Sequence, residues 1–484
     1  MTHAPSTAPF RQRYEVERIS RFCNIPRTCF IGCLETSQEY SSLWASLSIL
    51  AAKFNVTLPE RCKYRAWEKA VGDYRNVSLS GELKYSDKAG GPLFNFELRP
   101  LKLDASYRLA RKYGGDRVFT VSLPGLDPDD LPKYLKGCSN MVRDKIVKWI
   151  VDQNHYFLGR KWRAFYVKLE ARKSRDRKLP KTSSEPKYRI FMFAEDGDDF
   201  RRKVVKGEVD PRTLVHIPIT IRDMMDWFML ATHNRDKRCL QLFSRLALAV
   251  SSTVPTVIFK PEEIIKSDDA LADDPRPRRL DVRRSGINSE SAVMNDGCAR
   301  MSRAAANEIA VKLGLRRTPS VYQGRIGGAK GIWMIDALDE HHSGSERGYW
   351  IEITDSQLKF NGHPEDSLYP DELRTMFEVN DWSKKLGPAT LNFQLIPILE
   401  DRGVPYEVFQ RLLQEDLTSK VADLKDAMAD PASLRKWNQD NNPVVGERLA
   451  NNGVEMLAGV PNSLAERINW FLEVSITESP YGHG

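Results

Sequence analysis

Apolar residues recur at helical spacing in several stretches of the chain. In residues 40–55, for example, Leu43, Leu47 and Leu50 lie three or four positions apart. Side chains at this spacing share one face of a helix, which can then pack on a core. The spacing predicts helices over residues 40–55, 139–153 and 304–313, and one or two helices over residues 224–250.

Short apolar or alternating runs, bounded by turn-forming residues, predict strands. Residues 90–125 alternate in this way. Further predicted strands cover residues 188–193, 254–259, 331–335, 349–353 and 391–398. Short strands therefore dominate residues 280–400, and the pattern alone predicts a closed or sandwiched sheet there.

The pattern changes to helical spacing again after Val404. Pro405 stands at a position that favours helix initiation, and apolar residues then recur every three or four positions up to Met428. Two further helices are predicted over residues 432–439 and 463–474. Residues 1–20 lack the apolar centre of a secretory signal, and we expect them to form a short disordered lead-in.

The 484-residue chain is long enough for two or three domains, and its mixture of elements predicts an α+β protein. We expect a mixed N-terminal region over 1–105, a mixed α/β region over 106–250, a β-rich domain over 251–403 and a helical connector over 404–484. No run of eighteen apolar residues predicts a membrane span. The seven cysteines show no Cys-x2-Cys spacing, which favours reduced thiols in an intracellular protein without a zinc site.

The net charge of +8 is concentrated in residues 160–189. Twelve basic and three acidic residues give this window a larger net charge than the whole chain. Aromatic residues are interleaved, which suits a phosphate backbone with stacked bases. The alternative is a core strand followed by a solvated loop. The predicted RNA-binding residues are Arg160, Lys161, Arg163, Arg172, Lys173, Arg175 and Arg177.

A single lysine, Lys330, stands inside the glycine-rich segment Gly-Gly-Ala-Lys-Gly at residues 327–331. Glycines let a backbone approach a ligand closely, and a lysine among them can meet a phosphate as a point charge. The alternative is an ordinary solvated loop lysine. On these residues alone, the segment predicts an anion site and nothing more specific.

Two clusters carry a family resemblance: Met-Asn-Asp-Gly-Cys at residues 294–298, and a Pro-Ser segment at residues 319–331 that contains Gln323, Arg325 and Lys330. They resemble the catalytic core of the cellular, fungal-type RNA-dependent RNA polymerases of RNA silencing. Further similar segments follow the family order and extend the resemblance to residues 105–430. These segments cover residues 108–121, 157–168, 351–360 and 391–404.

The resemblance implies a double-psi β-barrel and nucleotidyl transfer on a single-stranded RNA template. It assigns Gln323, Arg325, Lys330 and Lys359 to contacts with RNA and nucleoside triphosphates. It also implies Mg²⁺ for the complete enzyme. The chain departs from the family pattern at three positions, with Ala299 in place of the usual glycine, and with Thr354 and Phe393 in place of the usual arginines.

The family's metal-binding loop, Asp-x-Asp-Gly-Asp, is not found before the chain ends at Gly484. We therefore expect this chain to be the N-terminal part of a polymerase that holds no metal and has no catalytic residue of its own, its partner being the missing C-terminal catalytic half. The alternative is a non-catalytic RNA-binding module or an inactive polymerase relative.

An Asp-Gly-Asp sequence does occur at residues 196–198, but Ala194 replaces the first acidic residue of the family loop. We interpret residues 194–199 as a solvated acidic turn after the strand 188–193. The alternative is an unrelated nucleotidyltransferase whose metal is held by Asp196, Asp198 and Asp199, because carboxylates around a glycine can bind a hard divalent cation.

The purified 484-residue chain is predicted to bind RNA weakly and to incorporate no nucleotides. Nucleotidyl transfer needs two divalent ions held by carboxylates, and Lys330 and Lys359 cannot hold them. The measurement is magnesium-dependent incorporation of labelled nucleotides, with and without an added segment that carries the acidic loop. Incorporation by the chain alone, abolished by Asp198→Asn, would instead make residues 196–199 the active site.

Overall fold

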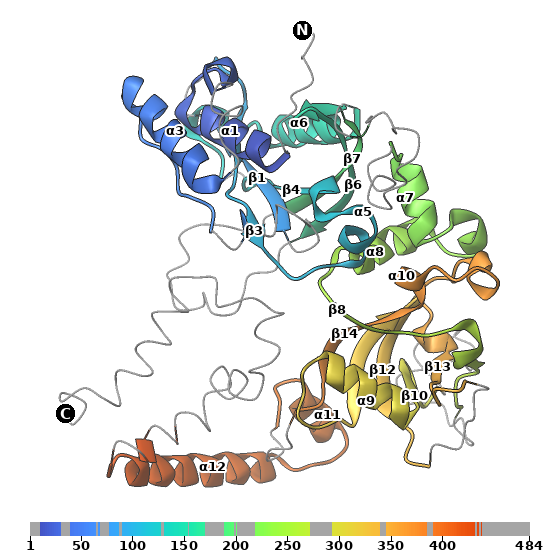
Figure 1. Ribbon diagram of the computed structural model, residues 1–484. Coiled ribbons are helices and arrows are strands. Elements are labelled where there is room, and N and C mark those ends of the chain that lie inside the picture. Colours follow the sequence, from blue (N-terminus) through green and yellow to red (C-terminus); the bar gives the residue numbers. More distant parts are fainter. Residues whose placement is uncertain are drawn as a thin grey trace. The chain divides into compact units, whose positions relative to one another are not determined.

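The computed structural model describes residues 10–30, 39–63, 66–67, 77–86, 90–126, 130–152, 154–169, 188–197, 200, 218–271, 293–338, 345–384, 391–430, 433–434 and 437 (Figure 1). The chain forms two compact units. One comprises Met1–Ala305 and Val321–Asp381, and the other comprises Ala306–Ser320 and Trp382–Gly484. Helices and strands are mixed in the first unit, as the predicted α+β class requires.

The first unit contains a seven-stranded sheet in its N-terminal part. Its strands are β1 (Val77–Tyr85), β2 (Phe94–Leu98), β3 (Lys102–Leu103), β4 (Val118–Ser122), β5 (His155–Phe157), β6 (Arg160–Leu169) and β7 (Tyr188–Gly197). They pair in the order β2-β1-β4-β7-β6-β5, and β3 also pairs with β1. The pairing of β1 with β4 is parallel, and the other pairings are antiparallel.

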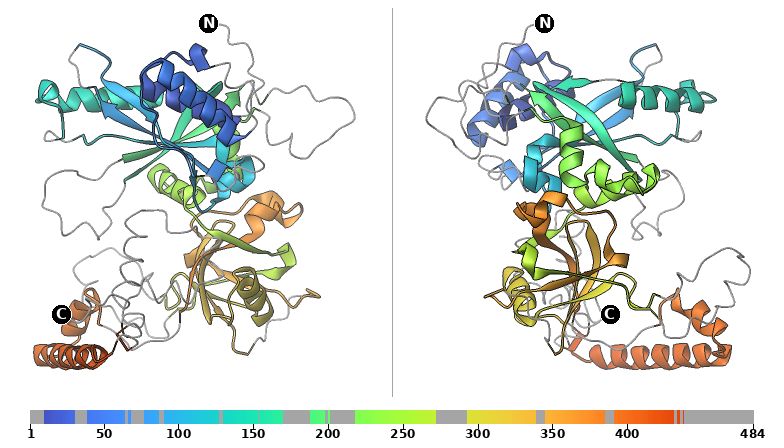
Figure 2. Two further views of the ribbon diagram at one scale, coloured as in Figure 1. Left: turned by 60° about the vertical axis from the view of Figure 1, so that its left-hand side comes forward. Right: turned by 90° about the vertical axis from the view of Figure 1, so that its right-hand side faces the viewer.

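Both faces of this sheet are covered by helices (Figure 2). Successive side chains of a strand point to opposite faces. Ile190 and Met192 of β7 accordingly join one core, and Phe191 and Phe193 join the other. The first core includes side chains of α1 (Phe10–Cys23), α3 (Tyr40–Lys53) and α6 (Ser139–Asp152). The second includes side chains of α5 (Arg108–Tyr113), α7 (Ile221–Phe228) and α8 (Cys239–Val250).

The prediction of a disordered lead-in over residues 1–20 is wrong for residues 10–20, which belong to α1. Phe10, Tyr14 and Ile19 lie in the first core, and the Tyr14 hydroxyl donates to the Arg99 carbonyl at 2.7 Å. The sequence was misleading because charged residues separate these apolar positions. Several of the charged residues are themselves buried. Arg18, for example, pairs with Glu15 inside the fold.

A second seven-stranded sheet follows in the same unit. Its strands are β8 (Val254–Ile258), β9 (Ile264–Ser267), β10 (Cys298–Met301), β11 (Val321–Ile326), β12 (Ala329–Ile335), β13 (Ile351–Thr354) and β14 (Met376–Trp382). They pair in the order β8-β14-β11-β12-β10-β13-β9 in a curled sheet (Figure 2). The short helix α10 (Glu372–Thr375) precedes β14, and α9 (Arg303–Lys312) follows β10. This confirms the predicted β-rich region in outline.

Two predicted strands are corrected by the structure. Residues 108–113, inside the alternating stretch 90–125, form α5, whose Leu109 and Tyr113 pack on the first sheet. The predicted strand over residues 391–398 is also wrong, because α11 spans Leu395–Asp401. The Asn392 side chain accepts from the backbone N–H of Leu395 at 2.7 Å and begins the turn. Pro397 also lacks the N–H that a central strand would need.

The remaining predicted helices are mostly confirmed. The spans of α3, α6, α9 and the pair α7–α8 match the expected ranges, and α12 (Tyr406–Ala427) follows Pro405 as predicted. The helix predicted over 432–439 is described at only a few positions, and the one over 463–474 lies outside the described residues. None of the described helices is long and apolar enough to cross a membrane.

One buried carboxylate links the two sheets. The carboxylate of Glu378 on β14 accepts from the guanidinium groups of Arg108 and Arg111 on α5, with a distance of 2.6 Å to Arg108 Nη2. Arg108 also donates to the Gly327 carbonyl at 2.6 Å, and Arg111 donates to the Thr253 hydroxyl at 2.9 Å. All three charged side chains are almost fully buried. Such close pairing offsets the cost of taking these charges out of water.

Replacement of Glu378 by alanine is predicted to destabilise the protein by about 3–5 kcal/mol, because it leaves two arginines buried without their acceptor. Urea unfolding of the full chain measures the change. The matched control is Glu262→Ala, which removes an exposed carboxylate 4.0 Å from Lys260 and should cost less than about 1 kcal/mol. Equal effects of the two variants would show that Glu378 is not an essential link.

Candidate functional site

The glycine-rich segment forms a tight hairpin between β11 and β12. Gly327 and Gly328 make the turn, and Gly327 has a positive φ of 54°, which favours glycine. The backbone N–H of Gly327 donates to the Arg374 carbonyl at 2.7 Å. Directly opposite residues of a strand pair share a face, so Arg325 and Lys330, which are register partners, lie on the same side of the sheet.

Two glycines beside Lys330 are required by close packing. A Cβ on Gly328 would lie 2.0 Å from the Phe360 carbonyl oxygen, and a Cβ on Gly331 would lie 2.3 Å from the Gly297 carbonyl oxygen. The backbone N–H of Lys359 also donates to the Gly328 carbonyl at 2.9 Å. These contacts bring together the two family-like segments and the segment that contains Lys359.

Lys330 belongs to a group of four cations. Burial lowers the pKa of Lys330, and the nearby charges of Arg325, Lys359 and Arg245 lower it further. Lys359 Nζ donates to the Ser356 carbonyl at 2.6 Å. In the part of the chain that the structure describes, none of these four side chains has a carboxylate partner. We call Arg245, Arg325, Lys330 and Lys359 the cation group.

The two arginines of the cation group keep unused donors. Arg325 is only 6% exposed and donates through Nη1 to the Leu248 carbonyl at 2.9 Å. Burial, and to a smaller extent the charge of Arg108, lowers the pKa of Arg325 to about 10, so the group remains protonated at neutral pH. The Nε atoms of Arg325 and Arg245 are both buried without a hydrogen-bond partner. A buried donor without an acceptor is costly.

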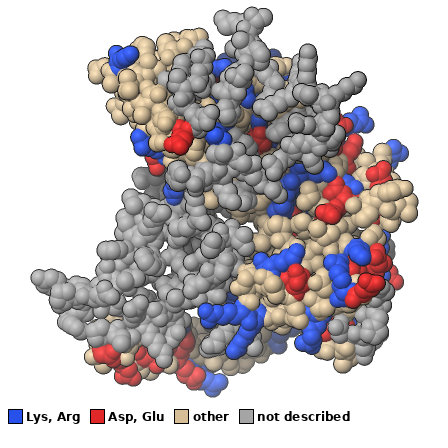
Figure 3. Space-filling view, viewed as in Figure 1, with Lys and Arg blue, Asp and Glu red and all other residues tan. Residues whose placement is uncertain are grey.

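The same side of the hairpin carries Gln323, whose side chain accepts from Asn380 Nδ2 at 3.4 Å. Ile332 and Met334 on β12 are partly exposed on this side, next to the cations. On the molecular face seen in Figure 3, Lys and Arg are interspersed with Asp and Glu, so that face is not uniformly basic.

The predicted basic segment is only partly available for RNA. Arg160 is 1% exposed, pairs with Asp116 at 2.8 Å and lies over the Phe10 ring, so it is a structural residue. Lys161 and Arg163 lie near Glu195, at 3.1 and 3.7 Å. Arg172, Lys173, Arg175 and Arg177 lie outside the described residues. Trp162, one of the interleaved aromatic residues, is fully buried, as the alternative of a core strand predicts.

The interpretation of residues 194–199 as a solvated turn is wrong for its first four residues, which continue β7. Ala194 is fully buried, and Glu195 accepts from the backbone N–H of Ile221 at 3.1 Å while it pairs with Lys161. Asp198 and Asp199 lie outside the described residues. Among the residues that are described, no group of three His, Cys, Asp or Glu side chains is placed to hold a metal ion.

Sequence reasoning missed Arg245 and Arg108. Arg245 lies on α8. From the sequence, the helical spacing predicts only that this residue is on a partly buried face of the helix. Arg108 lies in a family-like segment, but its contact with Gly327 joins positions more than two hundred residues apart in the chain. Only the three-dimensional structure shows that both are near the Lys330 hairpin.

Comparison with known proteins identifies the class. The family model described as RNA dependent RNA polymerase matches residues 93–481, which is most of the chain. The chain therefore belongs to the RNA dependent RNA polymerase family, and the family resemblance of the sequence motifs is confirmed.

Individual relatives are plant and fungal polymerases. The chain is 32% identical over 145 residues to "Probable RNA-dependent RNA polymerase 1" of Oryza sativa subsp. japonica, covering 30% of this chain and 16% of that protein. It is 26% identical over 284 residues to "RNA-dependent RNA polymerase 6" of Arabidopsis thaliana, covering 58% of this chain and 18% of that protein.

The fold is similar to a solved structure, "RNA dependent RNA polymerase QDE-1 from Thielavia terrestris", with a TM-score of 0.70 and 29% identity. That match covers 93% of this chain and 45% of the solved chain. The present chain thus spans less than half the length of the proteins it matches.

Proposed function

We propose that this chain is part of an RNA-dependent RNA polymerase of RNA silencing and supplies contacts to RNA and to nucleoside triphosphates. The cation group is the observation that carries the proposal. Its four positive side chains lack carboxylate partners among the described residues, and two of them keep buried N–H donors without acceptors. A triphosphate or an RNA phosphate would satisfy both the charge and the donors.

In the proposed reaction, an RNA 3′-hydroxyl attacks the α-phosphate of a nucleoside triphosphate. Lys330 and Lys359 would neutralise negative charge on the phosphates, as positioned cations do in phosphoryl transfer. Arg325 and Arg245 would add directional N–H donors, and Gln323 would contact RNA at the edge of the group. Mg²⁺ held by carboxylates outside the described residues would supply the stabilisation of the entering and leaving oxygens.

The proposal includes a double-psi β-barrel built around the second sheet. The parallel pairs β10–β12 and β13–β9, together with the antiparallel β11–β12 hairpin, support such a barrel, because crossing parallel connections are needed to build it. The alternative remains a non-catalytic RNA-binding module that uses the same cation group. It would bind RNA through these residues without preferring a triphosphate.

The double variant Lys330→Gln/Lys359→Gln is predicted to weaken binding of ATP to the full chain by about tenfold or more, because it removes two charge-assisted bonds to phosphate. Equilibrium dialysis with labelled ATP measures the change. The matched control Lys133→Gln/Lys266→Gln removes two exposed lysines outside the cation group and should leave ATP binding unchanged.

Unchanged ATP affinity in the Lys330→Gln/Lys359→Gln variant would contradict the triphosphate contact. The RNA-binding module would be favoured instead if the wild-type chain binds RNA but not ATP and the double variant loses RNA binding. The pH dependence gives a second readout. Because the pKa of Lys330 lies below its ordinary value, ATP binding should weaken as the pH rises through that lowered pKa, and Lys330→Arg should extend binding to higher pH.

The basic segment gives a separate prediction for RNA. Replacing Arg172, Lys173, Arg175 and Arg177 by glutamine should lower affinity for single-stranded RNA of any sequence. It should also reduce the slope of log affinity against log salt by roughly 0.7 for each phosphate that the variant no longer neutralises. Filter binding at several salt concentrations measures both effects. An unchanged slope would show that the segment is solvated and does not contact RNA.

A further inference from the structure

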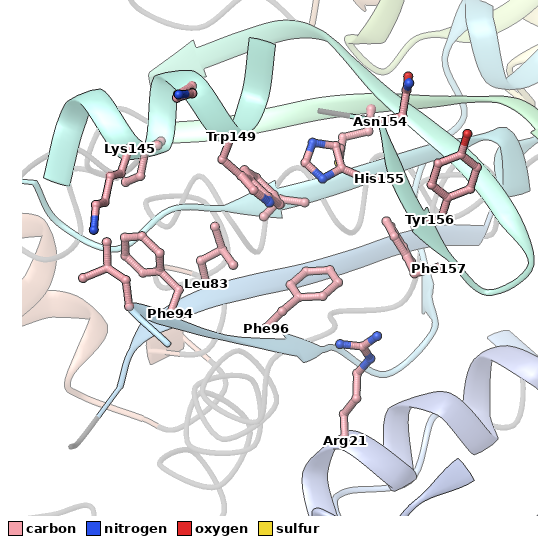
Figure 4. Close-up of a pocket in the computed structure, with 15 residues that line it drawn as sticks. Arg21, Leu83, Phe94, Phe96, Lys145, Trp149, Asn154, His155, Tyr156 and Phe157 are labelled. Carbon is pink, nitrogen blue, oxygen red and sulfur yellow. The ribbon is translucent and has the colours of Figure 1, made fainter. Parts of the chain in front are cut away.

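A cavity of about 610 Å³ lies between α6 and the first sheet, apart from the cation group (Figure 4). Its walls come from β1, β2 and β5, from α6 and from Arg21 on α1. A volume of this size is in the range of sites that hold small organic ligands. No part of the proposed polymerase chemistry described above uses it.

Aromatic side chains form most of its walls. Trp149 projects from α6 toward the sheet, and Phe94, Phe96 and Phe157 line the opposite side (Figure 4). The Trp149 and His155 rings lie 4.1 Å apart, and the rings of Phe96 and Phe157 lie 5.5 Å apart. Trp149, Phe94, Phe96 and Phe157 are each only half-buried. The surface that these side chains leave exposed suits an apolar, planar ligand.

His155 gives the cavity an unused polar atom. The residue is 8% exposed, and its Nε2 atom is buried without a hydrogen-bond partner. Burial lowers the pKa of His155, which keeps the imidazole neutral at pH 7, while a hydrogen bond to the Trp149 backbone opposes the shift. Because Nε2 has no partner, we assign the proton that donates to the Trp149 backbone to Nδ1, which leaves Nε2 as an acceptor. A ligand in the cavity should therefore present an N–H group to Nε2.

The mouth of the cavity is basic. Lys145 and Lys148 on α6 are exposed, and Arg21 reaches the cavity from α1 while it remains paired with Glu17 at 2.7 Å. The residues that line the cavity include no aspartate or glutamate. The combination of aromatic walls, a buried acceptor without a partner and exposed lysines matches a nucleobase with its attached phosphate.

We propose that this cavity binds one unpaired nucleotide, with the base stacked against Trp149 and its N–H donating to His155 Nε2, and with the phosphate near Lys145 and Lys148. The nucleotide is either free or part of a single-stranded RNA. If the ligand is RNA, the cavity is an additional RNA contact and the inference rests on the proposed function. If the ligand is a free nucleotide, its binding does not depend on polymerase activity. All four RNA bases carry an N–H group, so we expect little base preference.

The test uses the full 484-residue chain, isothermal titration calorimetry and a pair of ligands that differ in one group. Adenosine 5′-monophosphate has the exocyclic amine, and purine riboside 5′-monophosphate lacks it. Wild-type protein should bind the adenosine form about three- to tenfold more tightly, the effect of one hydrogen bond to a buried acceptor. His155→Phe keeps a ring that can stack but removes the acceptor, so it should bind the two ligands equally.

Charge and location are tested in parallel. Lys145→Gln/Lys148→Gln should weaken binding of both ligands by about three- to tenfold, because the variant removes the cations that bind phosphate. The matched pair Lys133→Gln/Lys136→Gln, exposed lysines that do not line the cavity, should have no effect. A short single-stranded RNA with one 4-thiouridine should form a photochemical cross-link to a peptide within residues 145–157, as identified by mass spectrometry.

Binding of adenosine monophosphate without an RNA cross-link would assign the site to a free nucleotide, and a cross-link without monophosphate binding would assign it to an RNA strand. Absence of both overturns the proposal, as does equal wild-type affinity for the two monophosphates. The Lys330→Gln/Lys359→Gln variant separates this site from the proposed function. It should lose ATP binding at the cation group and keep the preference for adenosine monophosphate over its purine analogue.

Discussion

The ion pairs of Glu378 with Arg108 and Arg111 are the constraint on which the first unit depends. Glu378 belongs to β14 of the second sheet, and both arginines belong to α5, which packs on the first sheet. Close pairing offsets the cost of taking these charges out of water. Directional bonds from two guanidinium groups to one carboxylate also hold β14 and α5 at a defined distance.

The same interaction extends to the candidate site. The Arg108 guanidinium, which binds Glu378, also donates to the Gly327 carbonyl in the hairpin turn. Gly327 is three residues before Lys330. Close contacts of Gly328 with Phe360 and of Gly331 with Gly297 then fix the hairpin against its neighbours. Lys330 thus stands on a backbone that is held at several points.

The sequence predicted the parts of this arrangement that depend on local pattern. Helical spacing located α3, α6 and α12, and the family-like segments pointed to Gln323, Arg325, Lys330 and Lys359, of which the last three lie close together in the fold. It failed where long-range contacts override local pattern. The charged helix α1 is buried because its polar groups find partners such as Glu15 with Arg18, and residues 395–401 form a helix because Asn392 starts a turn. The role of Arg160 was also hidden, since Asp116, its buried partner, lies far away in the sequence.

The balance of charge explains why the cation group is suited to a ligand and not only to structure. Glu378 offsets part of the charge of Arg108 and Arg111, but within the described residues no carboxylate is bonded to Arg245, Arg325, Lys330 or Lys359. Burial lowers the pKa of Lys330, and the neighbouring charges of Arg325, Lys359 and Arg245 lower it further. A bound anion would reduce the repulsion among these charges. Within the described residues, the fold therefore keeps four cations close together without a bonded carboxylate of the kind that Arg108 and Arg111 have in Glu378.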